Sequence, residues 1–272
     1  MENFLGFFED MPAMQKLIWV IICLSFVWTL EAVIPLVRHD YKKLRHDSIN
    51  LIFLSFSLVI NVLVGIATVG VFFWISQSQF GILNWIDWPI WAEVLIAVMA
   101  LDFFAQYVIH YVLHRVSWMW KFHMIHHSDT KVDATTGTRH HPGDYLIRES
   151  VAIATVIVFG IPVSYYVFYR ICTIFFTYLT HANISLPLWL DRTLSFVFVT
   201  PNVHKFHHHF ERPWTDTNFG NIFSIWDRIF GTFIYEDPRQ IKYGLDVLEG
   251  RDDEDVLFQL KIPMDKSIKT DY

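Results

Sequence analysis

Apolar and polar segments alternate along the chain, and four of the apolar segments are long. Three of them, from Met14 to Val37, from Ile49 to Ile75 and from Pro89 to Leu113, are each long enough to cross a bilayer, which takes about 20 helical residues. The fourth runs from Tyr145 to Tyr178 and is interrupted at Gly160-Ile161-Pro162, where proline breaks or kinks a helix. It therefore predicts two helices, either a hairpin that dips into the membrane and back or two short spans. The pattern predicts an all-α integral membrane protein with about four transmembrane or membrane-embedded helical segments.

Basic residues predict how these segments are oriented. The densest basic loop between two apolar segments contains Arg38, Lys42, Lys43 and Arg45. The loop after the second segment has no Lys or Arg and carries Trp85 and Trp88, as an outer interface would. Since positive charge marks cytoplasmic loops, the third segment should return the chain to the cytoplasm, in a bacterial inner membrane or the endoplasmic reticulum.

Composition narrows the chemistry. The 272 residues are 53% hydrophobic and 17% aromatic, which is too apolar for an ordinary soluble domain. The net charge of −6 gives no indication of nucleic-acid binding. Cys23 and Cys172 lie in apolar runs without CxxC spacing, so neither disulfides nor a thiolate metal site is expected. The acidic N-terminus lacks the features of a signal peptide, and we expect the first apolar segment to be retained as an anchor.

Twelve of the 14 histidines lie within the 100 residues from His110 to His209. They form the clusters HYVLH (His110, His114), HMIHH (His123, His126, His127), RHHP (His140, His141), the single His181, and HKFHHH (His204, His207, His208, His209). In the predicted topology every cluster emerges on the cytoplasmic face of the membrane. The sequence therefore predicts a histidine-rich metal cap on that face.

The spacing within the clusters is typical of metal ligands. Histidines at i and i+4 share one face of a helix, and the chain has one HxxxH and two HxxHH patterns. Together with His181 these patterns provide nine imidazoles, too many for one tetrahedral zinc site but enough for two metals with four or five nitrogens each. Imidazole suits Zn, Cu, Fe and Ni, and a pair of ions with an open position favours di-iron that activates O2. The HExxH pattern of zinc hydrolases is absent, because Tyr111 stands where that pattern has Glu.

Several residues near the clusters have open alternatives. His140 and His141 either supply a tenth ligand, with His141 the candidate, or are outer partners or polar loop residues. Asp102 and Gln106 precede His110 by steps of four, and we expect them to orient a ligand ring by accepting its other N–H.

Other polar residues are given less specific roles. We expect His209 to be a neighbour of the site, His39 and His46 to contact head groups or solvent, and Asp227 and Arg228 to form a structural ion pair. No catalytic residue is expected beyond the metal ligands.

The order of these motifs resembles the fatty acid hydroxylase/sterol desaturase superfamily. The resemblance covers roughly residues 95 to 235 and rests on DFFAQYVIHYVLHR (Asp102 to Arg115), WKFHMIHHSDT (Trp120 to Thr130), RHHP, HANI (His181 to Ile184), TPNVHKFHHH (Thr200 to His209) and NFGNIFSIWDRIFGTF (Asn218 to Phe233). It divides the chain into membrane anchor helices at 1–94, a catalytic domain at 95–235 and an acidic, solvated C-terminal tail at 236–272.

The resemblance implies a membrane-bound non-haem di-iron oxygenase that uses O2 and two external electrons to hydroxylate or desaturate a lipid C–H bond. The family's histidine boxes fall on His110, His114, His123, His126, His127, His204, His207 and His208, and its isolated histidine falls on His181. The electron donor would be a separate ferredoxin, cytochrome or reductase. Fatty acyl, sterol, carotenoid and ether lipids all remain as substrates. An alternative from another class is a membrane metal-binding or carrier protein without oxygenase activity, in which ligands would be spread along a path on both membrane faces.

Overall fold

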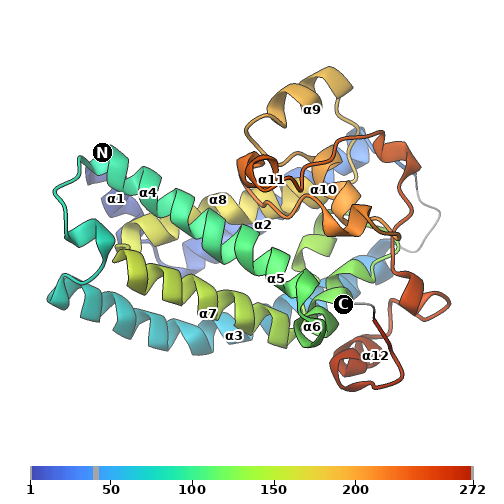
Figure 1. Ribbon diagram of the computed structural model, residues 1–272, viewed down its shortest axis with the longest axis horizontal. Helices are drawn as coiled ribbons and strands as arrows, with labels where there is room; N and C mark the ends of the chain where they lie inside the picture. Colours follow the sequence, from blue (N-terminus) through green and yellow to red (C-terminus); the bar gives the residue numbers. More distant parts are fainter. Residues whose placement is uncertain (1, 39–42, 271–272) are drawn as a thin grey trace.

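A computed structural model describes residues 2–38 and 43–270, and within these ranges the protein is almost entirely helical (Figure 1). The long helices are α2 (Ala13–Val33), α3 (Lys43–Ser78), α4 (Ile90–Asp102), α7 (Pro142–Phe159) and α8 (Val163–His181). The shorter elements are α1 (Glu2–Glu9), η1 (Ile82–Asn84), η2 (Phe103–Val108), α5 (Ile109–Arg115), α6 (Ser117–His127), η3 (Ala134–Thr138), α9 (Leu188–Leu194), α10 (Pro201–His207), η4 (Trp214–Asp216), α11 (Ile225–Ile229), η5 (Pro238–Gln240), η6 (Asp246–Leu248), α12 (Val256–Lys261) and η7 (Ile262–Met264). In the described ranges, β structure is limited to isolated bridges.

Three helical stretches are long and apolar enough to cross a membrane: α2, α3 with its extension to Asn84, and the continuous stretch from α4 to α5. With 36 residues at 1.5 Å each, α3 is about 54 Å long, well beyond the roughly 30 Å hydrocarbon core. One end of α3 must therefore project from the bilayer. The prediction of an all-α membrane protein is confirmed.

The fourth apolar segment forms the antiparallel hairpin α7–α8, broken at 160–162 as predicted. Gly160 ends α7 with a left-handed φ of 68°, a conformation that favours glycine. The turn lies against Gly81 in the loop between α3 and α4, where a Cβ on Gly81 would come within 2.2 Å of the Gly160 nitrogen. Since this loop follows the far end of α3, the hairpin runs the whole depth of the bundle.

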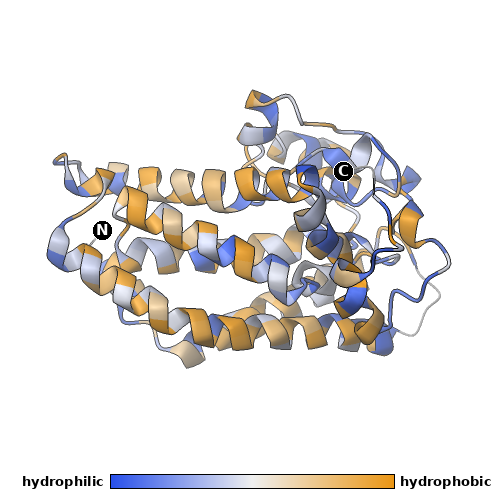
Figure 2. Ribbon diagram, turned by 60° about the horizontal axis from the view of Figure 1, so that its bottom comes forward, coloured by the Kyte–Doolittle hydropathy of each residue, from blue (hydrophilic) through white to orange (hydrophobic). Residues whose placement is uncertain are grey.

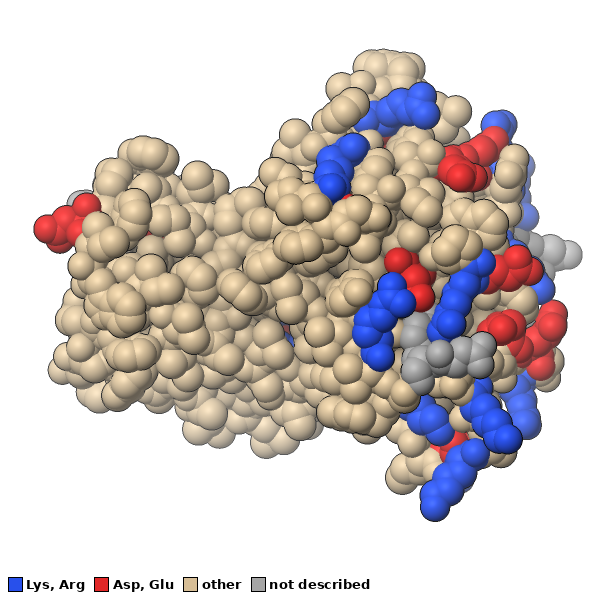
Figure 3. Space-filling view, viewed as in Figure 1, with Lys and Arg blue, Asp and Glu red and all other residues tan. Residues whose placement is uncertain are grey.

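Polar residues collect at one end of the bundle. Figure 2 shows hydrophobic residues along the long helices and hydrophilic ones at the end that carries the C-terminus. In Figure 3 nearly all the charged side chains in view lie at this same end, apart from an acidic group at the opposite tip. Helices α6, α9, α10, α11 and α12 form this polar cap (Figure 1).

The C-terminal segment is not the solvated tail that its acidic composition predicts. Its buried residues Leu245, Leu248, Ile262 and Ile268 share one apolar core with residues of α3 and α6, among them Phe53, Trp120, Met124 and Ile125. Lys121 of α6 also donates a hydrogen bond to the Asp265 carbonyl at 2.8 Å. The segment therefore packs against α6, the helix that carries the HMIHH cluster. The domain boundaries at 94 and 235 stay a prediction.

Candidate metal centre

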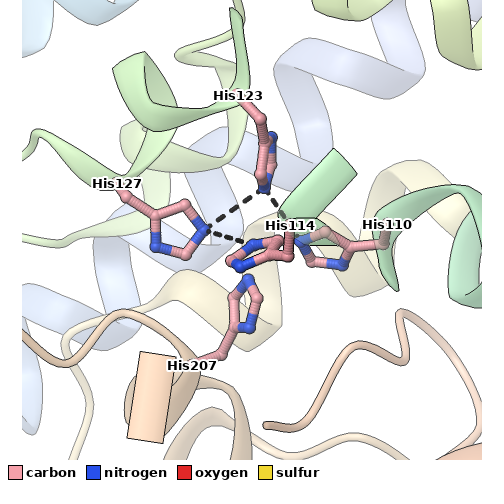
Figure 4. A group of neighbouring side chains, drawn as sticks. All are labelled: His110, His114, His123, His127 and His207. Atoms are coloured by element: carbon pink, nitrogen blue, oxygen red, sulfur yellow. Dashed lines mark hydrogen bonds between the residues drawn. The ribbon is translucent and has the colours of Figure 1, made fainter. Parts of the chain in front are cut away.

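Nine buried histidines meet at the polar end of the bundle in two adjacent groups. One group contains His110, His114, His123, His127 and His207, and the other contains His126, His181, His204 and His208. Within each group the ligand atoms all lie within 4.8 Å of one another. Figure 4 shows the five rings of the first group turned toward a common centre. These nine are the imidazoles of the HxxxH and HxxHH patterns together with His181.

Helical spacing explains how each HxxHH pattern serves both groups. On α6, His123 and His127 are four residues apart and join the five-histidine group, while His126 points into the four-histidine group. Around α10 the roles are exchanged: His204 and His208 join the four-histidine group, and His207 joins the other. Because residues at i and i+4 share a helix face and i+3 lies to one side, each pattern bridges two neighbouring centres.

Contacts at the outer ring nitrogens determine which nitrogen carries the proton. The Nδ1 atoms of His110, His181 and His207 lie 2.7 to 2.8 Å from the backbone carbonyls of Phe219, Thr177 and Thr217. A carbonyl only accepts hydrogen bonds, so Nδ1 must be the protonated nitrogen. Each Nε2 then presents a lone pair to the centre of its group, which is the arrangement of a metal ligand.

Two carboxylates hold further rings in the same way. Asp144 Oδ2 lies 3.4 Å from His123 Nδ1, and Asp216 Oδ1 lies 3.3 Å from His114 Nδ1. The Nε2 atoms of His110 and His123 are only 3.0 Å apart, yet both Nδ1 atoms face an acceptor. Two lone pairs at that distance repel each other unless a cation lies between them, so this donor set fits a metal ion.

Buried nitrogens without a partner support the same conclusion. In the described part of the chain, His207 Nε2 and both ring nitrogens of His208 are buried and have no hydrogen-bond partner. Buried polar atoms are almost always satisfied, so these atoms indicate a ligand. The close Nε2 pairs are 3.0 to 3.2 Å apart. Nitrogens this close together fit a shared metal ion, since metal–nitrogen bonds are roughly 2.1 Å long.

Burial keeps the imidazoles neutral, as metal binding requires. It lowers the pKa of His123 to about 3, although the Asp144 carboxylate acts in the opposite direction. For His126, His127, His204, His207 and His208 burial, and then the neighbouring imidazoles, hold the pKa well below its usual value. At neutral pH the imidazoles of both groups are therefore unprotonated and free to bind a metal cation.

The structure distinguishes among the roles left open for the RHHP cluster. His141, the candidate tenth ligand, lies outside both groups because its two nitrogens face backbone atoms: Nδ1 accepts from the Gly143 N–H at 2.9 Å, and Nε2 lies 3.3 Å from the Leu260 carbonyl. It caps α7, which favours the alternative that His141 is a polar loop residue and not the tenth ligand. His140 is nearer the site, since its ring stacks on His126 at 4.6 Å and its Nδ1 lies 2.7 Å from Asp144.

The expected outer partners on the third span also differ from the prediction. Asp102 is fully buried, and among the described residues its side chain bonds to no histidine. It accepts hydrogen bonds from Trp226 Nε1 at 2.9 Å and Tyr169 Oη at 3.2 Å. The extrapolation in steps of four assumed an unbroken α-helix, whereas η2 is a π-helix and shifts the register of the residues before His110. Gln106 lines the cavity described below.

Three further expectations have different outcomes. His46 is buried and lies 2.9 Å from Asp129, so it does not contact solvent or head groups; His39 lies outside the described residues. Asp227 accepts from the backbone N–H groups of Phe219 and Gly220 at 2.8 and 2.9 Å, and the described contacts include no ion pair with Arg228. His209 lies beside Trp214, outside both groups.

Sequence reasoning missed Asp144, Asp216 and the carbonyls that orient the rings. Asp144, in the first turn of α7, follows His140 by four residues, and the two side chains pair. Asp216 is 102 residues from His114 in the chain, and every residue has a backbone carbonyl. The residue types therefore could not identify Asp216 or the carbonyls as partners of the rings.

A cavity of about 190 Å³ leads from the histidines into the membrane part of the bundle. Its walls include residues of α2, α3, α7 and α8, for example Val20, Leu58, Ala152 and Ile174. At its polar end lie His110, His126, His181 and His204. An apolar molecule in this cavity would therefore have one end beside the four-histidine group.

These features define a helical membrane protein with a histidine-rich, metal-binding centre at the polar end of an apolar helical bundle. Residues 94–232 match the fatty acid hydroxylase family. The chain belongs to this family, and the resemblance found in the motifs is confirmed.

Relatives of this chain act on lipids. Ornithine lipid hydroxylase OlsE of Rhizobium tropici is 29% identical over 156 residues, which cover 57% of this chain and 46% of the relative. Alkylglycerol monooxygenase of Homo sapiens is 30% identical over 149 residues, covering 55% and 32%, and that of Caenorhabditis elegans is 29% identical over 159 residues, covering 56% and 30%. The chain thus spans less than half the length of these relatives. No solved structure matches it.

Proposed function

We propose that this protein inserts oxygen from O2 into a lipid C–H bond, or desaturates it, at a di-iron centre held by the nine histidines. The observation that carries the proposal is the pair of adjacent groups of five and four buried imidazoles, with ring nitrogens that face each other at 3.0 to 3.2 Å. The lipid hydroxylase and monooxygenase among its relatives support a lipid substrate.

Two iron ions bound there would supply O2 activation, with electrons from a separate ferredoxin, cytochrome or reductase. In a hydroxylation one oxygen atom enters the C–H bond and the other leaves as water, which consumes two electrons and two protons. The metal supplies the difficult chemistry, and the protein supplies orientation and exclusion of water.

The chain's own residues perform those two tasks. Carbonyls of Phe219, Thr177 and Thr217 hold the rings in place, and Asp144 and Asp216 do so for two more. The cavity is lined in part by apolar residues of the candidate membrane spans α2 and α3, such as Val20 and Leu58, which supports an apolar substrate. Arg38, Lys43 and Arg45 lie at the histidine end of the bundle, which supports a cytoplasmic position for the centre.

An isotope experiment tests this proposal. Protein loaded with iron is incubated with membrane lipids, a reduced ferredoxin system and ¹⁸O2, and the lipids are analysed by mass spectrometry. We expect a lipid product that contains ¹⁸O from the native protein and from the matched control His209→Ala, but none from His126→Ala or His207→Ala. A desaturase would instead give a lipid lighter by two hydrogens, with the same dependence on the variants. An iron-loaded, reducible protein that forms neither product would overturn the proposal in favour of a metal carrier.

A further inference from the structure

The cavity contains two arginines from the α7–α8 hairpin, and their surroundings differ. Arg170 is engaged on both sides: its Nη1 donates to Glu149 Oε1 at 2.7 Å and its Nη2 to Tyr145 Oη at 3.1 Å. Tyr166 donates to the other Glu149 oxygen at 3.4 Å. The charge of Arg170 is thus matched within the protein, and this network ties the two helices of the hairpin together.

The two Nη atoms of Arg148 have no comparable partners among the described residues. Its Nε lies 3.3 Å from Asp144 Oδ1, and Asp144 is shared with the rings of His123 and His140. The contacts of the described residues include no hydrogen bond from Nη1 or Nη2. The side chain is only 12% exposed and lines the cavity. Two N–H-bearing nitrogens of a permanent cation therefore face the cavity without a protein partner.

This arrangement is costly unless a ligand completes it. Charged groups among membrane helices are expensive and are usually functional, and a guanidinium presents a planar fork that suits carboxylate and carbonyl oxygens. Glu149, the acidic residue on the cavity wall, is already engaged by Arg170 and Tyr166. The missing acceptor must therefore be supplied by the molecule that occupies the cavity.

The position of Arg148 relates this acceptor to the histidines. Arg148 lies one helical turn beyond Asp144, whose carboxylate touches His123, and it lines the same cavity as His126, His181 and His204. An oxygen bound at Arg148 places the neighbouring carbon atoms beside the four-histidine group. The remainder of the chain of such a lipid would extend along α7 and α8 toward Ala152 and Arg170.

We propose that Arg148 is a positioning residue that binds an acyl oxygen of the substrate, so that the protein selects lipids with a carboxylate or acyl carbonyl close to the oxidised carbon. The inference rests on the proposed function only in taking this cavity as the substrate site. It excludes lipids that lack an acceptor oxygen near the reacting carbon.

Binding of fluorescent polyenes tests the proposal without turnover. Full-length protein as isolated, in detergent and without a reductant, is titrated with parinaric acid, its methyl ester and the hydrocarbon diphenylhexatriene, and energy transfer from tryptophan reports binding. The variants are Arg148→Gln, Arg148→Lys and the control Arg192→Gln, since Arg192 lies over the Tyr235 ring away from the cavity.

We expect Arg148→Gln to weaken binding of the acid at least tenfold and to leave the hydrocarbon unchanged, with part of the affinity restored in Arg148→Lys. If Arg148→Gln also lost affinity for the methyl ester to the same extent, the contact would be assigned to the acyl carbonyl. If only affinity for the acid fell, the contact would be assigned to the carboxylate. The proposal would be overturned if Arg148→Gln and the native protein bound the acid and the ester with equal affinity. It would also be overturned if affinity for the hydrocarbon fell in parallel, because that result would indicate a damaged cavity. Iron and electrons play no part in this readout, so its failure is distinct from failure of the oxygenase proposal.

Discussion

The two histidine groups are built from the same helices but differ in what surrounds them. In the five-histidine group, four rings have an outer partner: the Phe219 and Thr217 carbonyls and the Asp216 and Asp144 carboxylates. In the four-histidine group only His181 has one, the Thr177 carbonyl, among the contacts of the described residues. The cavity, in contrast, is lined by three histidines of the four-histidine group and by one of the other. We infer that the five-histidine group is held rigidly by its outer partners, whereas the four-histidine group is the one that borders the cavity.

The largest effect should come from the neighbouring residues His126 and His127, which belong to different groups. We expect His126→Ala and His127→Ala each to lower activity more than about 100-fold, because loss of a ligand exceeds the 10- to 100-fold cost of losing an outer partner. Metal analysis by mass spectrometry should find about one iron fewer in each variant, and His209→Ala serves as the control. If either variant kept both ions, the assignment of that ring to its group would be wrong.

Replacing the carboxylates should have a smaller effect, concentrated in the five-histidine group. In Asp144→Asn and Asp216→Asn an amide replaces the charged acceptor of a ring N–H, and we expect metal to be released roughly 10 to 100 times more readily. The rate of iron loss to a chelator measures this. Unchanged rates in both variants would show that the carboxylates do not orient the rings.

Acid should destabilise the metal-free protein through both groups. A free histidine has a pKa near 6.5, and burial lowers the pKa of His123 to about 3. Between these values the unfolded chain binds more protons than the folded one, so stability is complete above about pH 6.5 and falls as the pH drops toward 3, by about 1.4 kcal/mol per pH unit for each proton. Thermal unfolding in detergent at several pH values tests the sign, and a protein that became more stable in this window would contradict it.

The smallest effect should separate His140 from His141. His141→Ala removes a helix cap, which costs about 1 kcal/mol of stability, and should retain both ions. His140→Ala removes the ring stacked on His126 and should reduce activity a few-fold without loss of metal. Unfolding curves and metal content distinguish the two, and loss of an ion from His141→Ala would restore it as a ligand.

Sequence reasoning succeeded where the signal is local. The i, i+3 and i+4 spacings identified eight of the nine histidines, and His181 was added as the isolated one. The interruption at 160–162 identified the turn between α7 and α8. The division of each HxxHH pattern between two groups depends on how α5, α6 and α10 are placed in three dimensions, which no local pattern contains.

Other features failed for specific physical reasons. No residue pattern in Phe103–Val108 indicates the π-helix η2, which shifts the register between Asp102 and His110. Steps of four therefore do not place Asp102 beside a ligand ring. In the C-terminal segment, buried residues such as Leu248 and Ile262 are separated by acidic residues, and the average composition concealed an apolar face that packs on α6. His46 was misjudged because its partner Asp129 is 83 residues away in the chain.

Mössbauer spectroscopy on protein expressed with labelled iron tests the proposed di-iron centre directly, with His126→Ala and His207→Ala representing the two groups. We expect two coupled irons per chain in the native protein and loss of the coupled signal in each variant. A single zinc ion, or metal that survives both substitutions, would contradict the di-iron centre.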